Sequence, residues 1–327
     1  FNGSFGANST ISNVMVQHFE CGAWIEDAQN LSVKHCRFRN NYADGTNLAS
    51  ACRNSTVEHC SYRNNGDDDM AAWSRVGLGV NVTYRYNTSE LCWRAAGIGF
   101  FGGKQHKAHH CLVIEPIEIG IRIDASFGGS AFSSSGFIEI YENSVYKGGT
   151  KQNVWNNSYD GAIYVTLTGA QYDIPNISFK NIDIIDSKGN AISVNNYNNS
   201  NKKLKVCFEN INVDGVGKHN VGNNGLYISS NVNGAVFIKN FEYKNVTGSN
   251  IMNRSAGSTK FVFKEETAEH DPCDFAGYYT VTVKPSLAVM GTVTGTGTYI
   301  ENTQVTLTAN PKPGYAFEKW SDGDTNP

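Results

Sequence analysis

The sequence predicts an all-β fold, a right-handed parallel β-helix followed by a small C-terminal β module. The first observation is an internal repeat. VKHCRFRNN at residues 33–41 recurs as VEHCSYRNN at residues 57–65, and one offset relates every matching position. Self-similarity at such a period is typical of solenoids, in which each repeat stacks on the one before it. A β-sandwich is the competing fold, but it would not need a fixed period of this kind.

A second family of repeats follows later in the chain. SFKNIDI at residues 178–184 matches CFENINV at 207–213 and FIKNFEY at 237–243. Asparagine is the usual turn residue, and stacked copies can hydrogen-bond through their amides. We therefore expect an internal amide ladder formed by the three recurring asparagines, Asn181, Asn210 and Asn240.

Alternation of apolar and polar residues marks individual strands. Residues 117–124 (IEIGIRID) alternate cleanly, and residues 137–141 (FIEIY) predict the next strand. Residues 93–103 (WRAAGIGFFGG) alternate and are rich in glycine, which indicates a strand with a tight turn. The serine- and glycine-rich residues 126–136 predict a loop.

The domain organisation follows from these patterns. The β-helix is expected to span residues 1–268 in about ten coils, with a linker at residues 269–277. Threonine and valine then alternate in short strands. Residues 278–327 resemble the small β-rich repeat modules common in bacterial surface and secreted proteins, here truncated at the C-terminus. That resemblance implies an extracellular bacterial protein in which the module is a spacer or a wall-interaction unit.

Composition excludes several classes of function. The net charge is −3, which argues against a general nucleic-acid binder, since such a protein needs a basic surface. No apolar run approaches the ~20 residues of a transmembrane helix, so no membrane span is expected. The chain begins at Phe1, and we interpret it as a mature or excised fragment, so the absence of a signal peptide says nothing. We expect a monomer.

The cysteines and histidines are interpreted as structural. None of the eight cysteines lies in a CxxC pair, which weakens a zinc-ribbon hypothesis. Cys36 and Cys60 share one repeat position and are expected to form an internal ladder, with a disulfide between neighbouring coils as the alternative. The recurring His18, His35 and His59 are not expected to bind metal, because nothing nearby completes a ligand spacing.

Four aspartates carry the chemistry. Asp44 falls in the same repeat position as Asp68, which has Asp67 and Asp69 on either side. Three adjacent acids cannot all lie on a regular strand without one pointing inward, so the backbone must bulge or turn and present at least two of them outward. Like charges this close raise one pKa and place a proton donor beside ionised bases, as glycoside hydrolysis by inversion requires. A Ca²⁺ site or an exposed acidic turn is the alternative.

The combination of NNYADGTNL, NNGDDDMAAW and CWRAAGIGFFGG resembles the catalytic region of glycoside hydrolase family 87, the α-1,3-glucanases and mycodextranases. The resemblance runs over about residues 1–265. It implies a right-handed β-helix, an inverting mechanism and three essential aspartates, which here are Asp44, Asp67 and Asp68. By analogy with related β-helix enzymes, Asp67 would be the general acid, while Asp44 and Asp68 hold and deprotonate the attacking water.

Further residues near the cluster are candidates for binding substrate. Asp69 is a fallback, because a one-residue bulge would exchange its role with that of a neighbour. Aromatic rings suit wet clefts, where they could stack on sugar faces, and Trp73 and Trp93 are the preferred pair. The substrate-binding candidates are Asp69, Trp73, Trp93, Tyr42, Phe100 and Phe101.

These observations predict a secreted, endo-acting, inverting hydrolase of α-1,3-glucan of the mutan or nigeran type. It would require no cofactor, and the sequence does not decide whether structural Ca²⁺ binds. The alternatives are another β-helix enzyme (a dextranase, polygalacturonase or polysaccharide lyase) or a non-catalytic β-helix adhesin. The Gly-His-Gly and Arg-x-Lys motifs of polygalacturonases are absent, which lowers that alternative.

Overall fold

The computed structural model describes residues 2–126, 131–150, 161–167, 174–196, 200–217, 222–265, 278–281, 283–295, 297–300, 305–321 and 325. The chain divides into two compact units, Phe1–Cys273 and Asp274–Pro327. The expected linker at residues 269–277 lies outside the described residues, as do residues 127–130 of the predicted loop.

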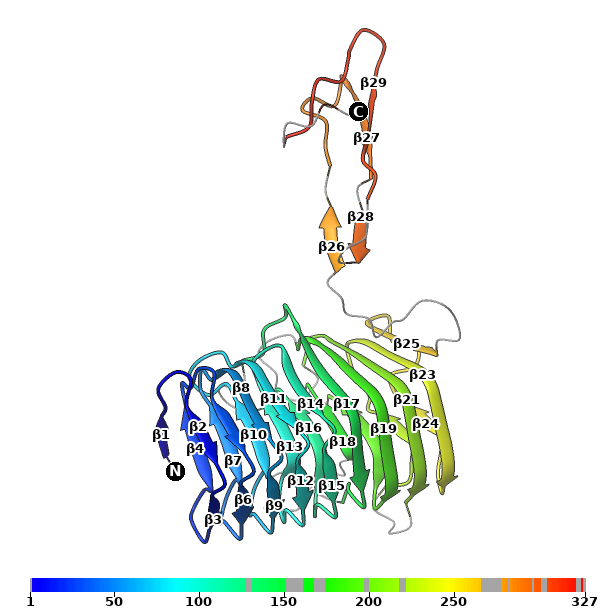
Figure 1. Cartoon of the computed structure of the whole chain (residues 1–327). Helices are drawn as coiled ribbons and strands as arrows, with labels where there is room; N and C mark the ends of the chain where they lie inside the picture. The colour runs from blue at the N-terminus through cyan, green and yellow to red at the C-terminus, as the bar shows by residue number, and fades with distance from the viewer. Residues whose placement is uncertain are drawn as a thin grey trace. The chain divides into compact units, whose positions relative to one another are not determined.

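The first unit is built from parallel strands that stack coil upon coil (Figure 1). One face is a ten-stranded sheet with one strand from each of ten coils. Its strands, in order across the sheet, are β1 (Asn2–Ser4), β4 (Ala23–Glu26), β7 (Thr46–Ala49), β10 (Met70–Trp73), β13 (Ala96–Phe101), β16 (Ile119–Asp124), β18 (Gly161–Thr166), β20 (Asn190–Asn195), β22 (Leu226–Ile228) and β24 (Ile251–Asn253).

A fifteen-stranded sheet supplies the remaining faces. The early coils contribute two short strands each, and the later coils contribute long strands that run across both faces. The strands are β2 (Thr10–Ser12), β3 (Met15–Gln17), β5 (Ser32–Lys34), β6 (Arg37–Arg39), β8 (Arg53–Glu58), β9 (Ser61–Arg63), β11 (Val80–Arg85), β12 (Thr88–Glu90), β14 (His106–His109), β15 (Leu112–Ile114), β17 (Phe137–Tyr146), β19 (Asn176–Ser187), β21 (Leu204–Val216), β23 (Gly234–Val246) and β25 (Phe261–Glu265).

The register agrees with the first internal repeat. Val33 pairs with Val57 between β5 and β8, and Phe38 pairs with Tyr62 between β6 and β9. The rings of Phe38 and Tyr62 stack inside the helix with centroids 5.1 Å apart. The predicted parallel β-helix is therefore confirmed.

Single residues in the left-handed conformation turn the chain at the corners of each coil. His35, His59 and Asn181 have φ between 52° and 54°, a region that asparagine and histidine visit more readily than most residues. The predicted asparagine ladder is present. The side-chain amide of Asn210 donates a 2.9 Å hydrogen bond to Asn181, and that of Asn240 donates one of 2.9 Å to Asn210. It lies on the surface and not inside the helix as expected, because these corner side chains point outward.

The repeated cysteines and histidines are structural, as expected. Cys36 and Cys60 are buried free thiols, and the Cys60 sulfur accepts a hydrogen bond from the Cys36 backbone. The imidazoles of His35 and His59 stack at the surface with centroids 5.3 Å apart.

The second unit contains two small antiparallel sheets, as its strand pattern predicted. β26 (Tyr278–Val281) pairs with β28 (Gly297–Ile300), and β27 (Gly291–Thr294) pairs with β29 (Thr308–Pro311). Across the described part of the whole chain, no helix is long and apolar enough to cross a membrane.

Candidate active site

The acidic cluster lies where the chain enters β7 and β10 of the ten-stranded sheet. The backbone N–H of Gly45 donates to the carbonyl of Asp68 at 2.9 Å, so Asp44 and Asp68 occupy equivalent places on adjacent coils. One carboxylate oxygen each of Asp44, Asp67 and Asp68 lies within 4.8 Å of the other two. We call these three residues the aspartate trio.

The turn before β10 explains why two consecutive aspartates reach the same side. Gly66 donates its N–H to the carbonyls of Asn41 and Ala43 at 2.9 and 3.1 Å. A Cβ at position 66 would lie 1.9 Å from the Tyr42 carbonyl oxygen, so only glycine allows this close approach. The Asp67 carboxylate then folds back to accept the N–H of Asp68 at 3.1 Å.

Each member of the trio has a different set of partners. Asp44 accepts a hydrogen bond from the Asn47 side-chain amide at 3.1 Å. Asp67 forms an ion pair with Arg94 at 3.4 Å. Asp68 accepts the backbone N–H of Ala96, from the next coil, at 2.9 Å.

Burial and mutual repulsion raise all three carboxyl pKa values. Burial, followed by the charge of Asp67, raises the pKa of Asp44 to about 7. Burial and the charges of Asp67 and Asp44 raise the pKa of Asp68 well above its usual range. Burial also raises the pKa of Asp67, but Arg94 opposes that rise. Groups this strongly coupled titrate as a unit, so the trio holds a proton near neutral pH.

Asp69 is a correction to the predicted site. It is fully buried, and its carboxylate accepts hydrogen bonds from Ser89 at 2.6 Å and Asn65 at 2.7 Å. One of the three consecutive acids therefore points inward, as strand geometry required, and these two donors satisfy it. Asp69 supports the turn from behind and cannot touch a substrate.

A cavity of about 220 Å³ opens beside the trio on the outer face of the ten-stranded sheet. Trp73, the last residue of β10, lines it, and Trp24 on β4 meets the Trp73 ring edge-on at 6.1 Å. Among the described residues, the buried Trp73 indole N–H and the Asn47 amide oxygen have no hydrogen-bond partner. Both are buried polar atoms in the cavity wall that have no partner within the protein.

The two phenylalanines of β13 separate by strand alternation. Phe101 lines the cavity and is 5 % exposed. Phe100 is fully buried and stacks on His106 inside the helix at 5.3 Å, so its predicted role in substrate binding is wrong. Successive side chains of a strand point to opposite faces, and Phe100 faces the core.

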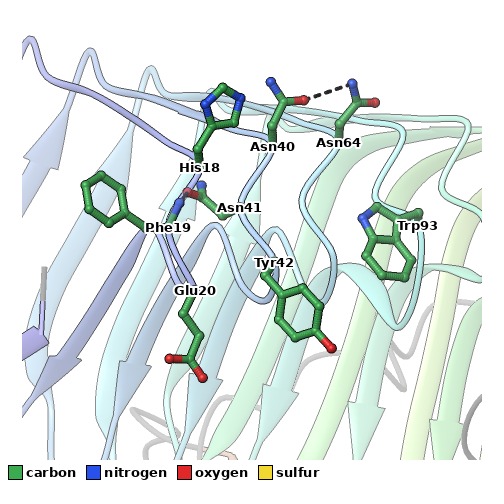
Figure 2. Close-up of a pocket in the computed structure, with 8 residues that line it drawn as sticks. All are labelled: His18, Phe19, Glu20, Asn40, Asn41, Tyr42, Asn64 and Trp93. Carbon is green, nitrogen blue, oxygen red and sulfur yellow. Dashed lines mark hydrogen bonds between the residues drawn. The ribbon is translucent and has the colours of Figure 1, made fainter.

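Tyr42 and Trp93 lie at the other end of the site, before the strands begin. They line a second hollow of about 640 Å³, together with residues 18–20 of the preceding corner and Asn64 of the corner between them (Figure 2). Tyr42 is 66 % exposed and Trp93 is 45 % exposed. The predicted pair Trp73 and Trp93 therefore does not form one platform, since the two rings belong to different hollows.

The separation of the carboxylates also differs from expectation. Inverting glycosidases commonly hold acid and base ~6.5–9.5 Å apart, and the predicted inverting mechanism implies that separation between Asp67 and its two partners. The observed oxygens lie within 4.8 Å. The reason is the turn before β10, which brings the side chains of the neighbouring residues Asp67 and Asp68 to the same side.

Four residues that surround the trio were not predicted from the sequence: Trp24, Asn47, Arg94 and Arg122. Arg122, on β16, is 3 % exposed, lines the cavity and forms an ion pair with the buried Asp124 at 2.5 Å. Position in the repeat could have found two of them. Asn47 lies three residues after Asp44 in the sequence, and Trp24 is the strand partner of Asn47 on the preceding coil.

The trio is also the group of acids that could hold a cation in the described part of the chain. Three carboxylates can supply three to six of the six to eight oxygens that Ca²⁺ takes, so the number of ligands does not decide between the two kinds of site. Arg94 and Arg122 already place positive charge beside the trio, which weakens the attraction for a metal. The donor set therefore fits acid–base chemistry better than a structural Ca²⁺ site.

Together, the fold and the site define a parallel β-helix with an acidic, aromatic-walled cleft on its ten-stranded face. Residues 1–254 match the family model described as α-1,3-glucanase catalytic domain D2. The chain belongs to this family, and the resemblance drawn from its motifs is confirmed. Residues 279–327 match the divergent InlB B-repeat domain.

Solved structures show the same fold. The Agl-KA catalytic domain is 33 % identical, with a TM-score of 0.70 over 80 % of this chain and 48 % of that one. The catalytic unit of a thermostable glycoside hydrolase family 87 α-1,3-glucanase from Streptomyces thermodiastaticus is 23 % identical, with a TM-score of 0.69 over 81 % and 50 %. The chain thus spans about half the length of these relatives. None of the curated proteins matches it.

Proposed function

We propose that this chain carries the catalytic site of a glycoside hydrolase that cleaves α-1,3-glucan. One observation carries the proposal. Three clustered carboxylates line a cleft walled by tryptophan and phenylalanine, in a chain of the α-1,3-glucanase catalytic domain family. Raised carboxyl pKa values suit general acid–base catalysis at a glycosidic bond. They do not by themselves assign the acid, because Arg94 opposes the pKa rise of Asp67 while the pKa values of Asp44 and Asp68 are strongly raised.

In this proposal, Asp67 is the general acid. It is the most exposed member of the trio, with 22 % of its side chain accessible, and it gives its proton to the glycosidic oxygen as the bond to the anomeric carbon breaks. Asp44 and Asp68 take a proton from the water whose oxygen attacks that carbon. In relatives crystallised with nigerose or tetrasaccharides, the three aspartates replaced by alanine have the same spacing along the chain as Asp44, Asp67 and Asp68.

The proposal of inversion rests on the pairing of Asp44 and Asp68. The distance to Asp67 does not support it, since retaining enzymes hold their carboxyl groups ~5–5.5 Å apart. A retaining enzyme needs one nucleophile, whereas two carboxylates on adjacent coils can hold one water between them through hydrogen bonds. The endo mode is proposed because the cavity that the trio lines continues to Trp73, and a second hollow lies before the strands, so that a chain can continue in both directions.

We also propose that the protein is secreted by a bacterium, acts as a monomer and needs no cofactor. The B-repeat match supports the first point, because such modules are common in surface and secreted proteins. The proposal that no cofactor is needed is supported by the arginines beside the trio, since they supply positive charge there without a metal.

The test is reducing-sugar release by the full chain from insoluble α-1,3-glucan, nigeran, dextran and pectate, with the product anomer followed by NMR. The proposal expects release from α-1,3-glucan and an initial β-anomer, the inverted configuration. An initial α-anomer would refute inversion. Release from dextran or pectate alone would favour another β-helix enzyme, and no release from any polymer would favour an adhesin.

A further inference from the structure

The second hollow lies at the corner that precedes the strands of the site. Tyr42, Gly66 and Trp93 stand at matching places on three successive coils. The N–H of Gly66 binds the carbonyl of Asn41, and the N–H of Trp93 binds the carbonyl of Asn65. Figure 2 shows the Tyr42 and Trp93 rings on the same side of this corner. We call these two rings the aromatic shelf.

Gly66 leaves the space that the shelf occupies. A Cβ at position 66 would lie 2.7 Å from the Trp93 ring, so the ring reaches over the middle coil toward Tyr42. The Arg94 guanidinium lies 5.4 Å from the centroid of each ring and pairs with Asp67 at 3.4 Å. Two exposed rings are thus held in place beside the outermost carboxylate of the trio by cation–π contacts.

The chemistry of the shelf suits a polysaccharide. Tyr42 and Trp93 expose 66 % and 45 % of their surface, and large exposed aromatic groups beside a cleft mark binding surfaces. The hollow is rimmed by hydrogen-bonding side chains of Glu20, Asn40 and Asn64. Flat apolar rings with a polar rim match a pyranose, which has C–H faces and hydroxyl edges.

The trio gives the bound chain a direction. Trp73 ends β10 and follows the trio along the chain, whereas the shelf precedes the strands. The trio itself lines the Trp73 cavity, so the cavity extends from the trio toward Trp73 and the shelf lies on the other side. Asp67 is joined to the shelf through Arg94. We propose that the shelf binds the leaving-group side of the α-1,3-glucan chain and the Trp73 cavity binds the glycosyl side. This inference rests on the proposed function, in which Asp67 protonates the leaving oxygen.

A comparison of two substrates tests the inference. An α-1,3-linked glucotetraose has sugars on both sides of the broken bond, whereas α-nigerosyl fluoride has only fluoride on the leaving side. Tyr42→Ala and Trp93→Ala should each lose at least about 5-fold more kcat/KM on the tetraose than on the fluoride, the size of one lost aromatic contact. Trp73→Ala should lose a similar factor on both substrates.

Conservative variants separate binding from disturbance of Arg94. Tyr42→Phe and Trp93→Tyr keep a ring and should recover most of the tetraose activity, and circular dichroism should show that every variant folds. Equal losses of the shelf variants on both substrates, or no loss on the tetraose, would overturn the shelf while wild-type activity still supports the proposed function. A wild-type chain that hydrolyses neither substrate would overturn the proposed function itself.

Discussion

The Ser89 hydroxyl donates a 2.6 Å hydrogen bond to Asp69 inside the helix, directly behind the trio. This bond helps to keep a carboxylate buried behind the site, next to the hydrophobic core. It also fixes which of three consecutive aspartates face outward. The geometry of the site therefore depends on a residue that the substrate does not reach.

Replacing Asp69 should change stability in a pH-dependent way. Burial raises its pKa to about 7 from 3.8. A protonated Asp69 therefore favours the folded state, a contribution that is complete below pH ~4 and lost as the pH rises through about 7. Asp69→Asn stays neutral, so its melting temperature relative to wild type should increase between pH 5 and pH 8.

The matched variant Asp69→Ala removes the carboxylate that accepts hydrogen bonds from Ser89 and Asn65. It should destabilise the fold by about 1–3 kcal/mol at both pH values, measured by chemical denaturation. A difference between Asp69→Asn and wild type that does not vary with pH would contradict the assigned pKa.

Each member of the trio should be essential. Asp44→Asn, Asp67→Asn and Asp68→Asn keep the shape but remove proton transfer, so each should lose at least ~10²-fold in kcat on α-1,3-glucan. Only the Asp67→Asn loss should be partly relieved on α-nigerosyl fluoride, because fluoride leaves without a proton. Rescue of Asp44→Asn in place of Asp67→Asn would show that the acid and base are exchanged.

Arg94 should set the pH range of activity. Its charge lowers the pKa of both Asp67 and Asp44, opposing the effect of burial. Arg94→Gln removes that charge, so both pKa values should rise, and both limbs of the kcat/KM profile should move to higher pH. Arg85→Gln, which breaks an ion pair with Glu58 on the surface, is the control and should leave the profile in place. A profile that moves to lower pH in Arg94→Gln would refute this role.

Chelation should leave activity intact. Because arginines lie beside the trio and weaken its attraction for a cation, we expect EDTA to change neither kcat nor the melting temperature. The control is added CaCl₂ after dialysis, assayed in parallel. Loss of activity with EDTA and its recovery with Ca²⁺ would show that the trio or another site binds metal.

The fold was predictable because one period repeats along the sequence. Val33 and Val57 hold the same place in the repeat and pair between adjacent strands, and the same offset places Asp44 beside Asp68. Backbone pairing transmits such an offset directly into space. The repeat therefore predicted the coil stacking and which carboxylates come together.

The details of the site were less predictable because they depend on side-chain direction. Phe100 and Phe101 are residues of the same type, and only the register of β13 places the Phe100 side chain in the core. The inward turn of Asp69 depends on donors from Asn65 and Ser89, which no short motif reveals. Arg94 lies within the motif CWRAAGIGFFGG, but its ion pair with Asp67 joins two different coils.

In this helix the register between neighbouring strands does not depend on the length of chain that connects them. Near the trio, paired positions are one short coil apart in the sequence, as for Ala23 with Thr46 and Met70 with Ile98. Ile121 and Ile163 also pair on adjacent coils, although a much longer stretch of chain lies between them. The sheet keeps its register across this longer stretch. Insertions can thus alter the surroundings of the cleft while the three aspartates keep their positions. Selection can change which polymer is bound separately from the chemistry that hydrolyses it.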